Sequence, residues 1–386
     1  MSRFGRVLRR RWTLDPRVRY LNHGSFGAAP RPVIAEQDAW RRRMEREPMD
    51  LLGRELPVLL RRAAAPLAAF LGARADDLAF VENATAGVNA VLRSFPWRKG
   101  DELLLSDHAY PAVRNTALFL CARHGLRLRV ARLPFPLRSE REVVSAFARE
   151  FSGRVRLVVA DHVTSPSALV LPVRALAALC RRRGVPLLVD GAHAPGMLEL
   201  DVPAVGADWY TGNCHKWLCA PKGCAFLWAS RRGREGLHPA VISNRYGEGF
   251  PAEFDWCGTR DPSAWLSVGA ALRFHRALGG AALRRRNRAL ALRVAGRLSA
   301  AWGVELPAPA SCLGSMAALP LPLPGKAGQP QADALMLALR RRGFEVPVFH
   351  LDGRLLLRVS VQAYNEEADY RPLERLVPAL LAKMIP

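Results

Sequence analysis

The sequence contains very little lysine. Arginine carries nearly all of the positive charge, because the 57 lysine and arginine residues include lysine only at positions 99, 216, 222, 326 and 383. A lysine amine, unlike a guanidinium group, readily loses a proton and attacks carbonyl groups. A lysine in a chemically distinctive setting is therefore a candidate for catalysis, and Lys216 has such a setting in DWYTGNCHKWLCAPKG, residues 208–223.

The sequence also lacks long apolar runs. No stretch approaches the roughly 18 residues that a membrane-spanning helix needs, and the basic start MSRFGRVLRRRWTLDP is not followed by a segment of signal-peptide length. The seven cysteines are odd in number and irregularly spaced, which predicts reduced thiols and no disulfide framework. We therefore expect a cytoplasmic protein with no membrane partner.

A separate basic tail and a metal-binding motif are absent as well. The net charge is +23, but the arginines lie in short groups beside helical apolar patterns, such as 181–183, 284–286 and 340–342. This pattern predicts solvated helix faces and no nucleic-acid partner. Cys214, Cys219 and Cys224 do not have CxxC spacing, so we expect no metal site.

Short apolar runs alternate with amphipathic segments between residues 78 and 229. The expected strands are 78–81, 102–106, 127–133, 155–161, 185–190 and 224–229, and helices are expected at 111–125 and 172–184. This alternation predicts an α/β fold with a mostly parallel sheet between helices. Beyond residue 262 we expect a smaller α+β domain, with one long helix at 263–302, a helix at 331–342 and a strand at 354–361.

Polar residues follow four of the expected strands. In α/β sheets, ligands bind beyond the carboxyl ends of the strands. Asn83, Ala84 and Thr85 begin a helix that offers free N–H groups to a phosphate, although an ordinary capped helix start has the same pattern. His108 and Tyr110 follow the next strand, and either could stack on a flat ring.

Two further strand ends complete the pattern. Asp190, with His193 three residues later, ends an apolar strand, and a buried carboxylate there calls for a cationic partner such as a protonated ring nitrogen. Lys216 lies 26 residues after Asp190, directly after His215. A phosphate cradle, a ring-stacking residue, an acid and a lysine in this order predict a pyridoxal 5′-phosphate site.

Several segments resemble one enzyme family over nearly the whole chain. They are YLNHGSFGAAP, VENATAGVNAVLRSF, DHVTSPSALVLPV, LLVDGAHAPGMLELDV, ADWYTGNCHKWLCAPKG, AEFDWCGTRDPSAWLSV and RVSVQAYN. They are similar to the isopenicillin N epimerase-like branch of the class V aminotransferase superfamily, which is related to the cysteine desulfurases. The resemblance implies fold type I of the pyridoxal-phosphate enzymes, with a seven-stranded sheet in a large domain at 21–262, a small domain at 263–386, and an N-terminal segment, 1–20, that packs with the small domain.

The resemblance also implies roles for single residues in holding the cofactor. Lys216 matches the lysine that binds the cofactor covalently and moves the Cα proton, Asp190 the acid at the ring nitrogen, and His193 the partner of the ring hydroxyl. The phosphate contacts implied are Ala84, Thr85 and His215. His108 matches the ring-stacking position best, with Tyr110 as the alternative.

Other implied roles concern the substrate and a second subunit. Arg358 resembles the clamp for the substrate carboxylate, and Asn22 and His23 match a segment that folds over the substrate. The family is dimeric with sites at the subunit interface, so Thr259 is implied to reach the neighbouring subunit's phosphate.

The resemblance leaves the reaction on the amino-acid substrate open. Epimerisation is the first expectation and needs a second acid, for which Tyr110 and His23 are candidates. A carbon–sulfur β-lyase acting on a cysteine conjugate or sulfoxide, as in hercynylcysteine sulfoxide lyases, is the main alternative, followed by an aminotransferase and a non-catalytic regulator. Desulfuration through a persulfide is disfavoured, because residues 340–359, the interval around and before Arg358, contain no cysteine and Cys312 lies earlier.

Overall fold

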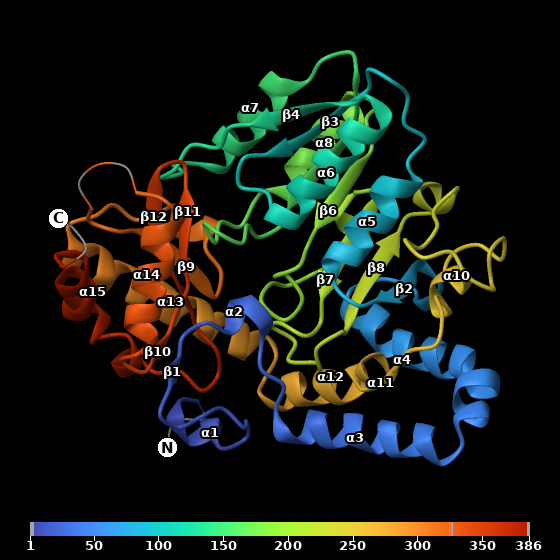
Figure 1. Ribbon diagram of the computed structural model, residues 1–386, viewed down its shortest axis with the longest axis horizontal. Helices are drawn as coiled ribbons and strands as arrows, with labels where there is room; N and C mark the ends of the chain where they lie inside the picture. Colours follow the sequence, from blue (N-terminus) through green and yellow to red (C-terminus); the bar gives the residue numbers. More distant parts are fainter. Residues whose placement is uncertain (1–3, 324, 326, 384–386) are drawn as a thin grey trace.

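The computed structural model describes residues 4–323, 325 and 327–383. Its centre is a seven-stranded sheet with the order β2-β8-β7-β6-β5-β3-β4, in which β8 is antiparallel to both neighbours and the other pairs are parallel (Figure 1). The strands are β2 (Leu78–Val81), β3 (Glu102–Ser106), β4 (Arg127–Ala131), β5 (Val155–Asp161), β6 (Leu187–Asp190), β7 (Trp209–Asn213) and β8 (Ala225–Ala229). The predicted α/β fold class and the mostly parallel sheet are confirmed.

Helices cover both faces of this sheet. Leu103 and Leu105 of β3 belong to an apolar cluster with α5 (Ala84–Ser94) and α6 (Pro111–His124), whereas Leu104 joins a cluster with α7 (Glu140–Glu150) and α8 (Val173–Arg182). Successive side chains of a strand point to opposite faces, so a continuous apolar run is buried only when both faces are covered. The apolar runs of the sequence therefore explain why this sheet lies at the centre, between two layers of helices.

Two predictions about secondary structure are wrong in detail. The residue pattern did not indicate β7, because WYTGN contains glycine and polar residues. The predicted long helix is three helices, α11 (Ser263–Leu266), α12 (Val268–Ala277) and α13 (Ala281–Trp302). Gly279 and Gly280 have positive φ angles of 96° and 48°, which interrupts the helix between α12 and α13.

The first two of these helices extend the packing of the large sheet. They contact α3 (Arg31–Arg46) and α4 (Leu56–Phe70), which the helical segment Met49–Glu55 joins. The apolar cluster of the sheet continues past residue 262 through α11 and α12 to Leu283, and it also includes Leu313 and Tyr364. The domain boundary between residues 262 and 263 stays a prediction.

A second, smaller sheet lies beside the first, on the left in Figure 1. It is antiparallel with the order β11-β12-β9, formed by β9 (Met316–Pro320), β11 (Val348–Leu351) and β12 (Arg354–Ser360). Its apolar core includes residues of α13, α14 (Gln329–Arg340) and α15 (Leu373–Leu381). No helix in the described part of the chain is long and apolar enough to cross a membrane.

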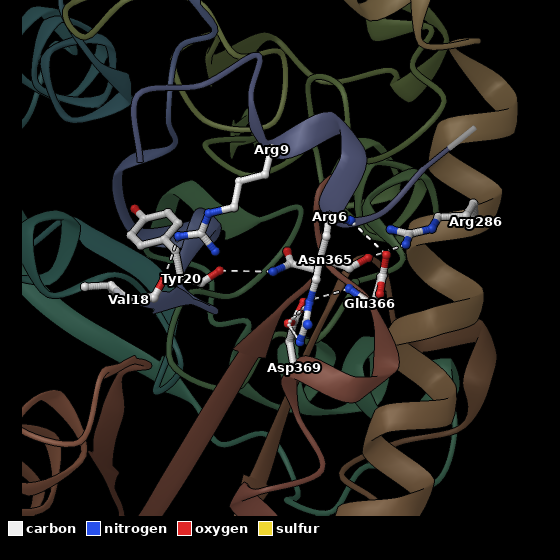
Figure 2. A network of polar contacts seen from close by, with 8 residues as sticks. All are labelled: Arg6, Arg9, Val18, Tyr20, Arg286, Asn365, Glu366 and Asp369. Carbon is white, nitrogen blue, oxygen red and sulfur yellow. Dashed lines mark hydrogen bonds and ion pairs between the residues drawn. The ribbon is translucent and has the colours of Figure 1, made fainter. Parts of the chain in front are cut away.

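The N-terminal segment contacts the C-terminal part of the chain. Strand β1 (Arg19–Tyr20) pairs in parallel with β10 (Phe344–Glu345), and the backbone N–H of Gly5 donates to the carbonyl of Ala363 at 2.8 Å. Figure 2 shows the polar part of this contact, in which Arg6, on α1 (Arg6–Arg9), reaches Asp369 at 3.0 Å and the amide of Asn365 donates to the Tyr20 carbonyl at 3.1 Å. The segment thereby leads directly into α2 (His23–Phe26), between the two sheets.

Candidate active site

A cavity of about 440 Å³ lies beyond the carboxyl ends of the central strands. Asp161, Asp190 and Asn213 end the parallel strands β5, β6 and β7, and all three line it. The start of α5 and the small α2 contribute further walls. Of the residues predicted for a site, those that line the cavity are Ala84, Thr85, Tyr110, Asp190, His193, His215 and Lys216.

Lys216 is buried, with 8% of its surface exposed, and its amine lies 3.1 Å from Nε2 of His193. The indole N–H of Trp217 donates to Nδ1 of the same ring at 3.3 Å. Because an indole can only donate, the proton of neutral His193 sits on Nε2 and is directed at the lysine amine. Burial and the charge of Arg358 lower the pKa of Lys216 to about 7, which agrees with a neutral amine that accepts this bond.

Asp190 is a buried carboxylate without a bonded cation among the described residues. Its Oδ1 accepts the backbone N–H of Ala192 at 2.9 Å. Burial raises its pKa, while the backbone bond and the charge of Lys216 oppose the rise. A cationic ring nitrogen in the cavity would stabilise the ionised form of this carboxylate.

The start of α5 presents one free backbone donor. The N–H of Ala84 donates to Oδ1 of Asn213 at 2.8 Å, and the N–H of Ala86 donates to Oδ1 of Asn83 at 2.9 Å. Neither the N–H nor the hydroxyl of Thr85 bonds to another described residue. The N-terminus of this eleven-residue helix therefore offers an anion the donors of Thr85 at its positive end.

His215 lines the same part of the cavity. Its Nδ1 donates to the carbonyl of Cys224 at 3.0 Å. Burial and the nearby charge of Lys216 lower its pKa to about 4. An anion bound beside the ring would favour its protonated form, which has a second N–H to donate.

Arg358, on β12, is fully buried above Phe349, with its guanidinium carbon 4.8 Å from the ring centre. One terminal nitrogen donates to the Ser165 carbonyl at 2.6 Å, and the other donates to Oγ of Ser25 at 3.0 Å and to Oδ1 of Asn22 at 3.4 Å. Ser25 and Ser165 also line the cavity. The fork is thus fixed beside the cavity by Ser165, in the loop after β5, and by Asn22 and Ser25 at α2.

Five predicted residues do not line the cavity: Asn22, His23, His108, Thr259 and Arg358. Nδ1 of the buried His23 bonds to the Tyr364 hydroxyl at 2.9 Å, and Nε2 lies 3.0 Å from the Lys216 carbonyl. His108 is also buried, with Nδ1 bonded to Oγ of Ser167 at 2.7 Å. Thr259 is exposed.

Sequence reasoning did not single out Asp161, Ser165 or Asn213 as site residues. Asp161 is the Cα partner of Asp190 in the parallel pair β5–β6, and burial together with the charge of Asp190 raises its pKa well above its usual range. The signal for it was present, because Asp161 ends the apolar run VRLVVAD just as Asp190 ends the next strand. Asn213 gave no comparable signal, since β7 was not expected.

Comparison with known proteins agrees with this geometry. The family model for aminotransferase class-V matches residues 29–371. The isopenicillin N epimerase of Amycolatopsis lactamdurans is 40% identical, over 95% of this chain and 96% of that protein, and a probable L-cysteine desulfhydrase of Arabidopsis thaliana is 33% identical, over 95% and 84%. An apo cysteine desulfurase of Thermococcus onnurineus superimposes with a TM-score of 0.80 at 17% identity, covering 99% of each chain.

Proposed function

The chain belongs to the class V aminotransferase family and is an enzyme that uses pyridoxal 5′-phosphate, and we propose that it acts as an amino-acid epimerase. The observation that carries the proposal is the meeting of the Lys216 amine and the Asp190 carboxylate in one cavity. The reaction itself is inferred from the 40% identity with an isopenicillin N epimerase over almost the full length of both chains.

The residues of the cavity fit the cofactor. The donors of Thr85 suit its phosphate, and the buried Asp190 lacks the cation that a protonated pyridine nitrogen supplies. Lys216 offers a neutral amine for covalent attachment, and His193 can bond the ring hydroxyl. When bound, the cofactor's ring stabilises negative charge on the α-carbon after a proton leaves it.

Proton transfer at the α-carbon is assigned to Lys216. Its pKa of about 7 allows the amine both to take a proton and to return it near neutral pH. Arg358 is assigned the substrate carboxylate: its two terminal nitrogens would exchange their bonds to Ser165 and Ser25 for bonds to this carboxylate, which would orient the α-hydrogen. Asp190 keeps the ring nitrogen protonated throughout.

Epimerisation requires a second acid on the face opposite Lys216, and we assign this role to Tyr110. Tyr110 lines the cavity and is 40% exposed, so its hydroxyl can approach a ligand. The two ring nitrogens of His23 are occupied inside the protein. His23 therefore acts in this proposal as a positioning residue that holds the Lys216 backbone, and His108, also outside the cavity wall, supports the loop that carries Tyr110.

β-Elimination is the second candidate, favoured by the 33% identity with an L-cysteine desulfhydrase. It begins with the same removal of the α-proton by Lys216, and it then expels a sulfur group from the β-carbon. No acid on the opposite face is needed. The two reactions therefore differ in their need for Tyr110.

Incubation of the holoenzyme with amino acids that contain sulfur, in deuterated water, separates these routes. Epimerisation gives α-deuterated product with loss of optical purity, and the Tyr110→Phe variant should still exchange the α-hydrogen while racemising at least about 100-fold more slowly. Release of pyruvate and a thiol or sulfenate instead supports the lyase. Formation of a keto acid only with an amino acceptor contradicts both.

We also propose that the enzyme is a cytoplasmic homodimer with the active site at the subunit interface. Thr259 is exposed and does not line the cavity of its own chain, which suits a contact with the phosphate of the neighbouring subunit. Mixing inactive Lys216→Ala and Thr259→Ala subunits tests this. A hybrid dimer contains one site with both residues changed and one site with neither changed, so partial recovery of activity is expected on mixing, and no recovery contradicts the shared site.

A further inference from the structure

A second and larger cavity, of about 760 Å³, lies at the opposite edge of the main sheet. Its walls include Val155 at the start of β5, Pro186 just before β6 and Trp209 at the start of β7, whereas the active site lies beyond the other ends of the same strands. The end of α5, at Ser94, also reaches it. Cavities of roughly 300–1,000 Å³ are typical of sites for small molecules.

The walls of this cavity combine aromatic surface with positive charge. Phe95, Phe151 and Trp209 supply flat apolar faces, and the indole N–H of Trp209 already donates to the Gly233 carbonyl at 2.6 Å. Trp209 is buried, with 9% of its surface exposed, so the accessible aromatic surface comes mainly from the partly buried Phe95 and Phe151.

The charge at the rim comes from Arg156, Arg183 and Arg232. None of these three side chains forms an ion pair with another described residue, and the guanidinium of Arg183 lies 5.7 Å from the Phe151 ring centre. Of the two carboxylates in the wall, Asp208 accepts the backbone N–H of Leu187 at 2.9 Å, and Glu235 is exposed. The three arginines therefore leave a positive rim beside aromatic faces.

We propose that this cavity is a binding site for a flat aromatic anion, such as an aryl carboxylate. The ring of the ligand lies against Phe151 and the exposed part of Trp209, and its acid group accepts hydrogen bonds from the guanidinium groups at the rim. This site is separate from the amino-acid site and does not depend on the reaction proposed above.

The structure offers a way to fill the cavity without straining the fold. Gly153 lines it, has no positive φ, and a Cβ built there meets no atom within 4 Å. Gly153→Leu should therefore occupy the opening. Gly296, on α13 and outside this cavity, has the same free surroundings, so Gly296→Leu is the matched control.

The test is calorimetric titration of the holoenzyme with 1-naphthoate and with the uncharged 1-naphthalenemethanol. We expect the acid to bind at least about tenfold more tightly than the alcohol, since the difference is a charge-assisted hydrogen bond. Binding of the acid should be lost in Gly153→Leu, weakened in Arg183→Gln and Arg232→Gln, and retained in Gly296→Leu. Equal binding of acid and alcohol, unchanged binding in Gly153→Leu, or no binding by the wild-type enzyme would overturn the proposal.

One more variant separates the two cavities. Arg358→Gln removes the carboxylate clamp of the active site and leaves the far cavity intact. Naphthoate should bind this variant as it binds the wild-type enzyme. Loss of naphthoate binding in Arg358→Gln, with retention in Gly153→Leu, would place the aryl acid in the active site and refute a second site.

Discussion

At the scale of single residues, burial of Lys216 makes its protonation unfavourable in the folded protein. Its pKa is about 7 when folded and 10.5 for the free side chain, so the unfolded chain holds the proton more tightly between these values. The free-energy cost of burying this amine is largest below pH 7, and it decreases as the pH rises toward 10.5. Stability should therefore increase with pH in this window.

The corresponding prediction concerns protein freed of cofactor. The wild type should gain about 2 kcal/mol of unfolding free energy relative to Lys216→Met between pH 7 and pH 9, because the variant has no proton to lose. Urea unfolding at each pH measures the difference. Lys99→Met serves as the control, and a constant difference between wild type and Lys216→Met would contradict the burial of a neutral amine.

Arg358 gives a second prediction at this scale. Arg358→Gln should lower kcat/KM by about 100-fold for an amino acid, because it removes charge-assisted hydrogen bonds to the carboxylate. For the corresponding amino-acid amide, which carries no carboxylate, the change should be much smaller. Arg354→Gln, on the same strand but exposed, is the control. An equal loss of kcat/KM for the amino acid and its amide would contradict a role of Arg358 in binding the substrate carboxylate.

The residues of the site were predictable to different degrees. Asp190 and His193 were predicted because they follow an apolar run that must end at one edge of the sheet, and Lys216 was predicted from its setting in a chain with few lysines. The structure brings all three to one cavity. Nothing in the sequence excluded His23 and His108 from the wall of the cavity, although neither lines it in the structure. Their side chains turn toward partners distant in the sequence, Tyr364 and Ser167, and no local pattern specifies such contacts.

At the scale of elements, α5 approaches β7 so closely that the contact requires glycine. A Cβ at Gly87 would lie 2.3 Å from Oγ1 of Thr211. Gly87→Ala should therefore push the helix away from the strand, costing about 2 kcal/mol of stability and weakening cofactor binding, since α5 begins at the expected phosphate site. Urea unfolding and titration with pyridoxal 5′-phosphate measure the two effects.

A second substitution tests the cause of this loss. Thr211→Ala removes the atoms that would collide, so the Gly87→Ala/Thr211→Ala variant should be less destabilised than the sum of the single variants. Thr211→Ala alone still loses the hydrogen bond from its hydroxyl to the Phe226 carbonyl. Strictly additive losses would show that the helix–strand contact is not the reason for glycine.

The elements that the sequence predicted are those with a strong local pattern. The other six strands of the main sheet contain more apolar residues than β7 and were expected close to their observed bounds. β7 includes Thr211, Gly212 and Asn213, and it is a strand because β6 and β8 pair with it on both sides. The break between α12 and α13 depends on two glycines, which a helical pattern of apolar residues does not reveal.

At the scale of the whole molecule, the N-terminal segment depends on a partly buried ion pair with the C-terminal part of the chain. The carboxylate of Asp369 is buried and accepts bonds from Arg6 and from the Glu366 backbone. Asp369→Ala should lower the unfolding free energy by about 1 kcal/mol, since the partly exposed Arg6 guanidinium and the Glu366 N–H lose their buried acceptor. Asp15→Ala, which removes an exposed pair with Arg17, should leave the urea midpoint unchanged. Equal effects would contradict this account.

The wall around Arg358 joins the two ends of the polypeptide. Asn22 and Ser25 come from the first tenth of the chain, and the guanidinium they contact comes from the last tenth. During synthesis the early residues leave the ribosome long before their partner exists. The proposed pocket for the substrate carboxylate is therefore completed only after residue 358 has been synthesised, and a product that stops before this residue has no such pocket.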